Sequence, residues 1–275
     1  MPELPETETI ARDLDGAIRG RRITKVSVRK ADVLREVTAR SLAKRLRNAT
    51  IVRSWRRAKL VVLDLDTGDR LVVQPRFTGA LLIDDGSFTG AELNYSTLRM
   101  DLDDGRFLHY ADVRRLGTVA LMTPKRFDEY SGKLGIEPLD RAFTAAHLSE
   151  VFRASSQPVK KVLMEQRKIA GIGNIYANEA LWRARIDPSR PAASVSVEEA
   201  RLLRDSIVGV LTEAIEARGT SFRDYRDARG QRGSFVDKLD VYGRAGLECH
   251  RCGARLVATH AIDGRVTTMC VRCQH

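Results

Sequence analysis

The chain has 275 residues, of which 43% are hydrophobic and 30% are charged, as in a folded globular protein of more than one domain. The formal net charge of +11 predicts a polyanionic partner, since Lys and Arg gain affinity by neutralising phosphates. No apolar run approaches the ~18 residues of a membrane span, and acidic residues at the start argue against a signal peptide. These features exclude a membrane protein and favour the cytoplasm.

The N-terminus reads Met1-Pro2-Glu3-Leu4-Pro5-Glu6. Removal of Met1, which is usual before a small residue, would expose the secondary amine of Pro2 as a nucleophile. An α-amino group has a pKa of ~7.7–8.0, so part of it is unprotonated at neutral pH. Glu3 and Glu6 are then candidates for the acid and base work. The alternative is that Pro5 simply starts a helix whose first turn favours Glu6.

The first half of the chain alternates polar and apolar residues, as strands do. Turn sequences at residues 66–69 and 103–105 predict two hairpins. Few helices here are long enough for crossovers between parallel strands, so we expect an antiparallel β-sandwich preceded by a short helix. The expected strands are residues 22–28, 51–55, 59–63, 70–73, 98–102 and 106–110.

After Gly132 the pattern becomes helical. Pro158 and Asn174 can each start a helix, and residues 196–199 form a capping box for a helix that stops at Gly219. Two glycines within residues 170–174 allow close backbone approach, and a helix start with an Asn side chain offers donors to a phosphate. An ordinary turn between helices is the alternative.

All four cysteines form two Cys-x2-Cys pairs near the C-terminus, with 17 residues between the pairs. This spacing is typical of a tetrahedral, all-thiolate zinc site, which is closed and structural. Two disulfides are not expected in a reducing compartment. His250, His260 and His275 are expected to face solvent. The predicted ligands of one Zn²⁺ ion are Cys249, Cys252, Cys270 and Cys273.

Five motifs in this order resemble the formamidopyrimidine-DNA glycosylase family, which includes endonuclease VIII-like enzymes. The resemblance runs nearly end to end, and the Leu4-Pro5 form is similar to the formamidopyrimidine branch. The motifs are Pro2-Glu3-Leu4-Pro5-Glu6, Arg56-Arg57-Ala58-Lys59, Asp112-Val113-Arg114-Arg115-Leu116-Gly117, Gly171-Ile172-Gly173-Asn174-Ile175-Tyr176 and the four-cysteine pattern.

The resemblance implies an α+β multidomain fold. It comprises an N-terminal catalytic β-sandwich with an N-terminal helix over residues 1–131, a helical domain with a helix-two-turns-helix over 132–235, and a zinc-finger hairpin over 236–275. Double-stranded DNA with damaged bases or abasic sites would lie in the cleft between the domains. The family also suggests a monomer without membrane association, in a bacterial-type cytoplasm and bound to the nucleoid.

Residue roles follow by similarity. Pro2 would attack C1′ of a flipped nucleotide, Glu3 would donate or shuttle a proton, Lys59 would assist the lyase steps, and Glu6 would support the site. Arg265, in the zinc hairpin, would grip phosphates and act in the last elimination step. A solvated charge at a strand end is the alternative for Lys59.

The DNA-binding residues implied are Asn174 for phosphate, Arg114 for the orphaned cytosine, Lys160 for DNA contact, and Phe77 and Tyr95. A structural ion pair is the alternative for Arg114, and a solvated pair with Lys161 is the alternative for Lys160. Phe77 stands where the family usually has a void-filling Met, Tyr95 near a DNA-contacting His, and Leu116 at the usual Phe wedge. These changes leave lesion range and opposite-base preference open. Both also depend on residues 220–235, expected to cover the flipped base.

The expected function is base-excision repair. A bifunctional glycosylase and abasic-site lyase would remove 8-oxoguanine and formamidopyrimidines and cut the strand by β,δ-elimination. The alternatives are an endonuclease VIII-like enzyme for oxidised pyrimidines or abasic sites, and a non-catalytic protein that binds damaged DNA.

Overall fold

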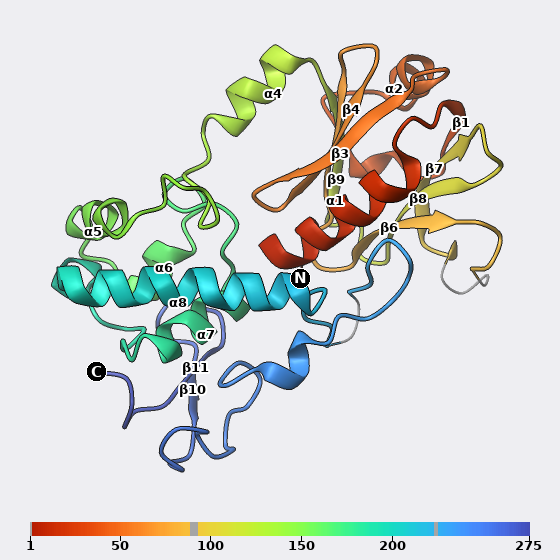
Figure 1. Cartoon of the computed structure of the whole chain (residues 1–275). Coiled ribbons are helices and arrows are strands. Elements are labelled where there is room, and N and C mark those ends of the chain that lie inside the picture. Colours follow the sequence, from red (N-terminus) through yellow and green to blue (C-terminus); the bar gives the residue numbers. More distant parts are fainter. Residues whose placement is uncertain (1, 89–92, 223–224) are drawn as a thin grey trace. The chain divides into compact units, whose positions relative to one another are not determined.

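A computed structural model describes residues 2–88, 93–222 and 225–275 (Figure 1). The chain forms two compact units. The first, called the sandwich unit, comprises Met1–Gly132 and Ala217–Val236, and the second, called the helical unit, comprises Lys133–Glu216 and Asp237–His275. The sequence-based division placed residues 217–235 in the helical domain. In the structure they join the sandwich, because Arg218 pairs with Asp13 and the Thr220 N–H donates to Glu6.

The sandwich unit begins with a helix and continues mainly as strands. Its elements are α1 (Leu4–Ile18), β1 (Ile23–Val28), η1 (Ala31–Val33), β2 (Leu34–Arg35), α2 (Ala39–Leu46), β3 (Ile51–Arg57), β4 (Leu60–Leu65), β5 (Arg70–Gln74), β6 (Gly79–Asp84), β7 (Ser96–Leu102), β8 (Phe107–Asp112), β9 (Thr118–Met122) and α4 (Pro124–Ser131).

Two sheets enclose the core of this unit. One is four-stranded in the order β1-β7-β8-β6, and the other is five-stranded in the order β2-β9-β5-β4-β3. Both predicted hairpins are present, as the antiparallel pairs β4–β5 and β7–β8. The sheets are not wholly antiparallel, because the two-residue strand β2 pairs in parallel with β9. Helix α1 packs on β3 and β4 and contributes Ile10, Leu14 and Ile18 to the core.

The helical unit is built around the longest helix. Its elements are α5 (Ala145–Arg153), α6 (Val159–Leu163), α7 (Asn174–Arg183), η2 (Ala192–Ser194), α8 (Val197–Glu216), β10 (Val257–Thr259) and β11 (Thr267–Met269), and η3 (Phe235–Lys238) joins the two units. The predicted capping box starts α8, since Ser196 Oγ accepts the Glu199 N–H at 3.2 Å and Glu199 Oε2 accepts the Ser196 N–H at 2.8 Å.

The fold class predicted from the sequence is confirmed, with a sandwich, a helical segment and a four-cysteine hairpin. Within the residues that the structure describes, each helix is too short or too polar to cross a membrane.

Candidate active site and metal centre

The start of α1 is fixed by the carboxylate of Glu6. Its Oε2 accepts the backbone N–H of Glu3 and its Oε1 accepts that of Thr220, each at 2.8 Å. Gly219 packs against this side chain, and a Cβ at that position would lie 2.9 Å from Glu6 Cγ. Glu3 and Glu6 are both 1% exposed. Pro2 and Glu3 are therefore held in one place by a side chain whose oxygens already accept backbone hydrogen bonds.

Lys59 lies at the tip of the β3–β4 hairpin, next to the first turn of α1. Arg57 pairs with Leu60, so Ala58 and Lys59 form a two-residue turn in which Ala58 has a φ of 52°. The carbonyl oxygen of Ala58 accepts hydrogen bonds from Thr7 Oγ1 of α1 at 3.3 Å and from Arg56 Nη1 at 3.1 Å. The bond from Thr7 brings the hairpin tip to the first turn of α1, which Pro2 and Glu3 precede.

Arg56 also joins this hairpin to α1 by a charge pair. Its Nε donates to Glu8 Oε2 at 2.7 Å, and its side chain is only 8% exposed. Burial opposes ionisation of Glu8, but the charge and hydrogen bond of Arg56 hold the pKa of Glu8 below its ordinary value. The two arginines of the Arg56–Lys59 motif are thus structural, since Arg57 donates to Ser131 Oγ at 3.1 Å.

Asp112 joins two loops that carry predicted DNA-binding residues. One of its oxygens accepts from Thr78 Oγ1 and the Arg114 N–H, and the other accepts from the Gly117 N–H at 2.8 Å. Tyr110 OH also donates to Asp112, and burial together with this carboxylate raises the pKa of Tyr110. Gly117 has no room for a side chain, because a Cβ would lie 1.9 Å from Tyr110 OH.

The two loops present apolar and cationic side chains to solvent. The Arg114 guanidinium lies 5.1 Å from the centre of the Phe77 ring, and Phe77 is 44% exposed. Val113 and Leu116 are exposed beside them. Tyr95 is also exposed, and its carbonyl accepts the Asp112 N–H at 3.0 Å, which places it at the same end of the sheet. Exposed apolar side chains on fixed loops suit a binding surface.

The segment from Ala217 to Val236 is anchored to α1 by charge. Arg218 donates to both Asp13 and the buried Asp227, and Asp227 accepts the N–H groups of Arg229 and Gln231. Phe222 is 46% exposed. The loop expected to cover a flipped base includes residues 223 and 224, which lie outside the described residues, so that expectation stays a prediction.

In the helical unit, two polar side chains hold the turn of the β10–β11 hairpin. Lys160 Nζ donates to Thr267 Oγ1 at 2.7 Å and lies 3.5 Å from Asp263 Oδ1. Asn174, the first residue of α7, donates from Nδ2 to the Val266 carbonyl at 3.0 Å. Asp263 in turn accepts the Arg265 N–H at 3.1 Å. The exposed Arg265 therefore projects from a turn that α6 and α7 fix in place.

Lys160 is buried in the structure. The sequence predicted direct contact with DNA, but the Lys160 side chain is 0% exposed and its ammonium group lies under the hairpin. A buried ammonium needs partners of this kind, because desolvation of an unpaired charge is costly. Direct contact of Lys160 with DNA stays a prediction, and in the structure its ammonium group supports the turn that carries Arg265.

The four cysteines come together as the spacing predicted. Their Sγ atoms all lie within 4.8 Å of one another, with 4.0 Å from Cys249 to Cys273 and 3.5 Å from Cys252 to Cys270. A tetrahedral zinc with Zn–S bonds of about 2.3 Å places sulfurs about 3.8 Å apart, so this set fits such an ion.

Burial opposes ionisation of the Cys249 thiol, but hydrogen bonds led by the Arg251 N–H lower its pKa to about 6. His250 is exposed and lies 3.0 Å from Asp240 instead.

Glu179 on α7 binds the backbone of the segment that leads into the four-cysteine cluster. Its carboxylate accepts the N–H groups of Asp240, Val241 and Tyr242 at 2.8, 3.0 and 2.7 Å. Burial raises the pKa of Glu179 although these bonds act in the opposite direction. Trp182, one turn further along α7, packs with the buried cysteines.

Family models match most of the chain. The formamidopyrimidine-DNA glycosylase N-terminal domain matches residues 1–119, and the formamidopyrimidine-DNA glycosylase H2TH domain matches residues 134–226. The chain belongs to the formamidopyrimidine-DNA glycosylase family. The resemblance inferred from the motifs is thereby confirmed.

Relatives in this family match over the full length of the chain. The formamidopyrimidine-DNA glycosylase of Heliobacterium modesticaldum is 42% identical, with 100% of both chains covered. A mutant of the Lactococcus lactis protein, in a complex with DNA that contains Fapy-dG, has a TM-score of 0.91 at 33% identity, also with 100% of both chains covered. The protein from Thermus thermophilus has a TM-score of 0.87 at 34% identity, with 99% of this chain and 98% of that chain covered.

Sequence reasoning assigned no role to Asp112 or Glu179. Both are buried carboxylates that accept backbone N–H groups. The N–H donors to Glu179 lie more than 60 residues away, whereas those to Asp112 belong to Arg114 and Gly117, close to it in the sequence. Asp112 could have been found, since it begins a family motif that contains Gly117. No local pattern marks Glu179.

We predict that Glu179→Gln destabilises the helical unit. The amide can accept at only one of the two oxygen positions, so buried N–H groups lose their partner at a cost of about 2 kcal/mol or more. Urea unfolding followed by fluorescence measures this. Glu216→Gln, an exposed change at the end of α8, is the matched control. Equal stability of the two variants would contradict the prediction.

Proposed function

We propose that this member of the formamidopyrimidine-DNA glycosylase family removes oxidised purines, such as 8-oxoguanine and formamidopyrimidines, from duplex DNA and then cleaves the strand as a lyase. The observation that carries the proposal is the meeting of the α1 start, with Pro2 and Glu3, and the hairpin tip with Lys59. The Lactococcus lactis relative, crystallised with Fapy-dG DNA and with abasic-site DNA, supports the substrate class. The protein would act as a monomer on chromosomal DNA in the cytoplasm.

The first step needs the free amine of Pro2, which requires removal of Met1. The Pro2 nitrogen forms a bond to C1′ while the C1′–base bond breaks, and the base leaves with the bonding electrons and takes up a proton. The nitrogen loses its proton, and Glu3 protonates the sugar ring oxygen as the ring opens. Because Pro2 is a secondary amine, the product is a cationic Schiff base that needs no further proton loss.

Strand cleavage follows from the charge of that Schiff base. The iminium accepts electrons, so a proton can leave C2′ and the bond from C3′ to its phosphate oxygen breaks. A second elimination at C5′ leaves a one-nucleotide gap with phosphate ends. We assign Lys59 to support these steps because it lies in the hairpin turn that Thr7 holds against the first turn of α1, and Arg265 to the phosphate lost last. Glu6 acts through Pro2 and Glu3, as a positioning residue.

The loops joined by Asp112 would fill the space that a flipped nucleotide leaves. Phe77 can stack on the exposed bases, and Arg114 above its ring can donate two parallel hydrogen bonds to the orphaned cytosine. Leu116 and Tyr95 would lie against the same duplex. Asn174 and the Arg265 turn would hold phosphates, although Asn174 Nδ2 also supports that turn.

We propose that the four-cysteine centre holds one structural Zn²⁺. Four thiolates leave no open position for a substrate, so the ion would stabilise the hairpin that carries Arg265 rather than act on DNA.

The nucleophile is tested by borohydride, which reduces a Schiff base to a permanent link between protein and DNA. On an 8-oxoguanine duplex we expect wild type to give a covalent adduct and Pro2→Gln to give none, since a large second residue leaves Met1 attached. Mass spectrometry of the N-terminus checks this. Lys133→Gln, which removes an exposed amine, should keep the adduct. Tight binding without any adduct in wild type would indicate a non-catalytic binding protein.

The proposed role of Arg114 in recognising the base opposite the lesion is tested by Arg114→Ala. Loss of a bidentate contact costs about 1–3 kcal/mol of discrimination, so we expect the preference for cytosine opposite the lesion to fall about 10- to 100-fold. Single-turnover rates on duplexes carrying 8-oxoguanine, formamidopyrimidine, dihydrouracil or an abasic site, each opposite every base, measure it. Arg115→Ala, whose side chain pairs with Asp32, is the control. Turnover mainly on dihydrouracil would replace our substrate assignment with the endonuclease VIII-like one.

Metal removal should weaken DNA binding more than it unfolds the protein. We expect one zinc per chain by elemental analysis, and loss of DNA affinity after chelation while the β-sheet circular dichroism signal remains. The sandwich contains no cysteine and should keep its core. Unchanged affinity after confirmed metal loss would refute this role for the hairpin.

A further inference from the structure

A basic groove lies between strand β1 and helix α2 of the sandwich unit, and nothing in the proposed reaction uses it. Its volume is about 590 Å³. Four of its lining side chains are cationic, and none of the lining residues that the structure describes is acidic. The lining residues are Thr24, Lys25, Val26, Arg40, Ala43, Lys44 and Arg47.

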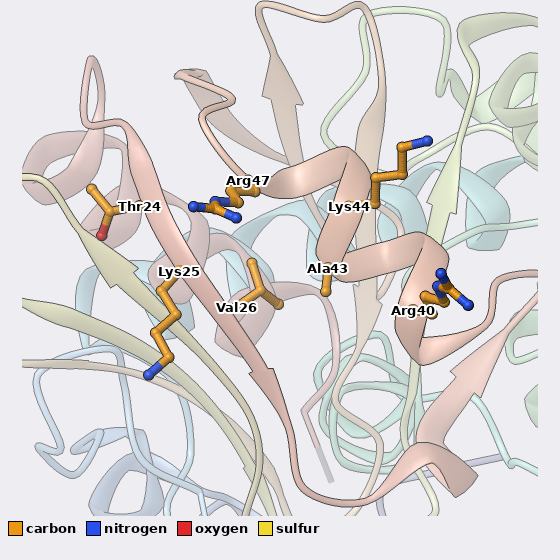
Figure 2. Close-up of a pocket in the computed structure, with 7 residues that line it drawn as sticks. All are labelled: Thr24, Lys25, Val26, Arg40, Ala43, Lys44 and Arg47. Atoms are coloured by element: carbon orange, nitrogen blue, oxygen red, sulfur yellow. The ribbon is translucent and has the colours of Figure 1, made fainter.

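The fold of α2 places these cations together. Leu42 and Leu46 are buried in the core, so Arg40, Lys44 and Arg47, spaced by four and three residues, lie on the other side of the helix and are exposed. Figure 2 shows them along α2, with Lys25 on β1. Within the described part of the chain, none of the four side chains has an ion-pair partner, whereas the neighbouring Arg45 pairs with Asp69.

The four cations line one groove with no acidic lining residue between them, and a polyanion that they neutralise gains affinity by releasing its condensed counterions. The other lining residues, Thr24, Val26 and Ala43, have small side chains. Val26 and Ala43 offer no deep apolar pocket for a peptide anchor, and no aromatic ring lines the groove on which an unpaired base could stack. Arg40 and Arg47 are separated by about 10 Å along the helix, enough for several phosphates of one strand.

The groove is separate from the nucleophile. Pro2 precedes the first turn of α1 and β1 follows its last turn, and a helix of 15 residues is about 22 Å long. Figure 1 shows α2 away from the N-terminus. We propose that this groove is a second, non-catalytic binding surface for the phosphate backbone of duplex DNA, which lets the protein hold an undamaged segment while the lesion site is occupied. The choice of DNA as ligand rests on the proposed function.

The test uses the full chain saturated with one equivalent of a short duplex that carries a stable abasic-site analogue. A labelled, undamaged duplex is then added at about 50 mM salt, and its binding is followed by fluorescence anisotropy. We expect wild type to bind this second duplex and Lys44→Gln/Arg47→Gln to bind it at least tenfold more weakly. Each neutralised contact should also lower the slope of log affinity against log salt by about 0.9.

The matched control is Lys125→Gln/Arg153→Gln, which removes one exposed lysine and one exposed arginine elsewhere. It should bind the second duplex as wild type does, and both double variants should keep the affinity for the abasic-site duplex. Absence of second-duplex binding in wild type, or equal loss in both variants, would overturn the proposal. If the abasic-site duplex fails to bind, the proposed function fails, and the groove is then tested with the undamaged duplex alone.

Two further measurements distinguish a DNA-binding groove from a helix-stabilising set of charges and from a protein-binding site. Lys44 and Arg47 lie at the C-terminal end of α2, where cations stabilise a helix. A lower melting temperature with unchanged second-duplex binding would show that this is their only role and refute the proposal. Polyglutamate that displaces the second duplex at lower charge concentration than unlabelled duplex would indicate an acidic protein partner instead. Slower hydrogen exchange in α2 when the second duplex binds would support the groove independently of any variant.

Discussion

The position of the proposed nucleophile depends on one buried carboxylate. Glu6 accepts a hydrogen bond from the backbone of Glu3 and another from Thr220, 214 residues away in the sequence. A buried carboxylate is costly unless donors surround it, and here one donor belongs to a helix start, where backbone N–H groups lack acceptors within the helix. The bond that satisfies the charge is therefore also the one that fixes the two residues before the helix. Gly219 is needed because any side chain there would collide with Glu6.

Asp112 and Glu179 are also buried carboxylates that accept backbone N–H groups, one in the sandwich unit and one in the helical unit. Asp112 joins the loops that carry Phe77 and Arg114, and Glu179 holds the three residues that lead into the cysteine hairpin. In each case the buried carboxylate collects charge-assisted hydrogen bonds, which are stronger than those of neutral groups. The exposed side chains assigned to DNA are thus held in position by residues that are themselves buried.

The cationic side chains likewise fall into two groups, those paired with carboxylates inside the fold and those left for a partner outside it. Arg56, Arg218 and Lys160 are paired with carboxylates and maintain the fold, so they contribute little to any external field. The cations of the α2 groove have no such pairing within the described residues, and Arg265 is exposed, with its guanidinium against the sulfur of Met164. A net charge alone therefore predicts a polyanionic partner, while the pairing pattern locates where that partner can be bound.

The sequence by itself determined the strand and helix pattern, the hairpins, the capping box of α8 and the cysteine set, because each depends on residues close together in the chain. Only the tertiary structure decided that residues 217–236 pack with the sandwich, that Lys160 lies beneath the hairpin, and that Glu179 holds Asp240 to Tyr242. Those outcomes depend on contacts between residues far apart in the chain, 61 positions for Glu179 to Asp240 and 205 for Arg218 to Asp13. No local propensity encodes such pairs, since burial and partner are set only when the core forms.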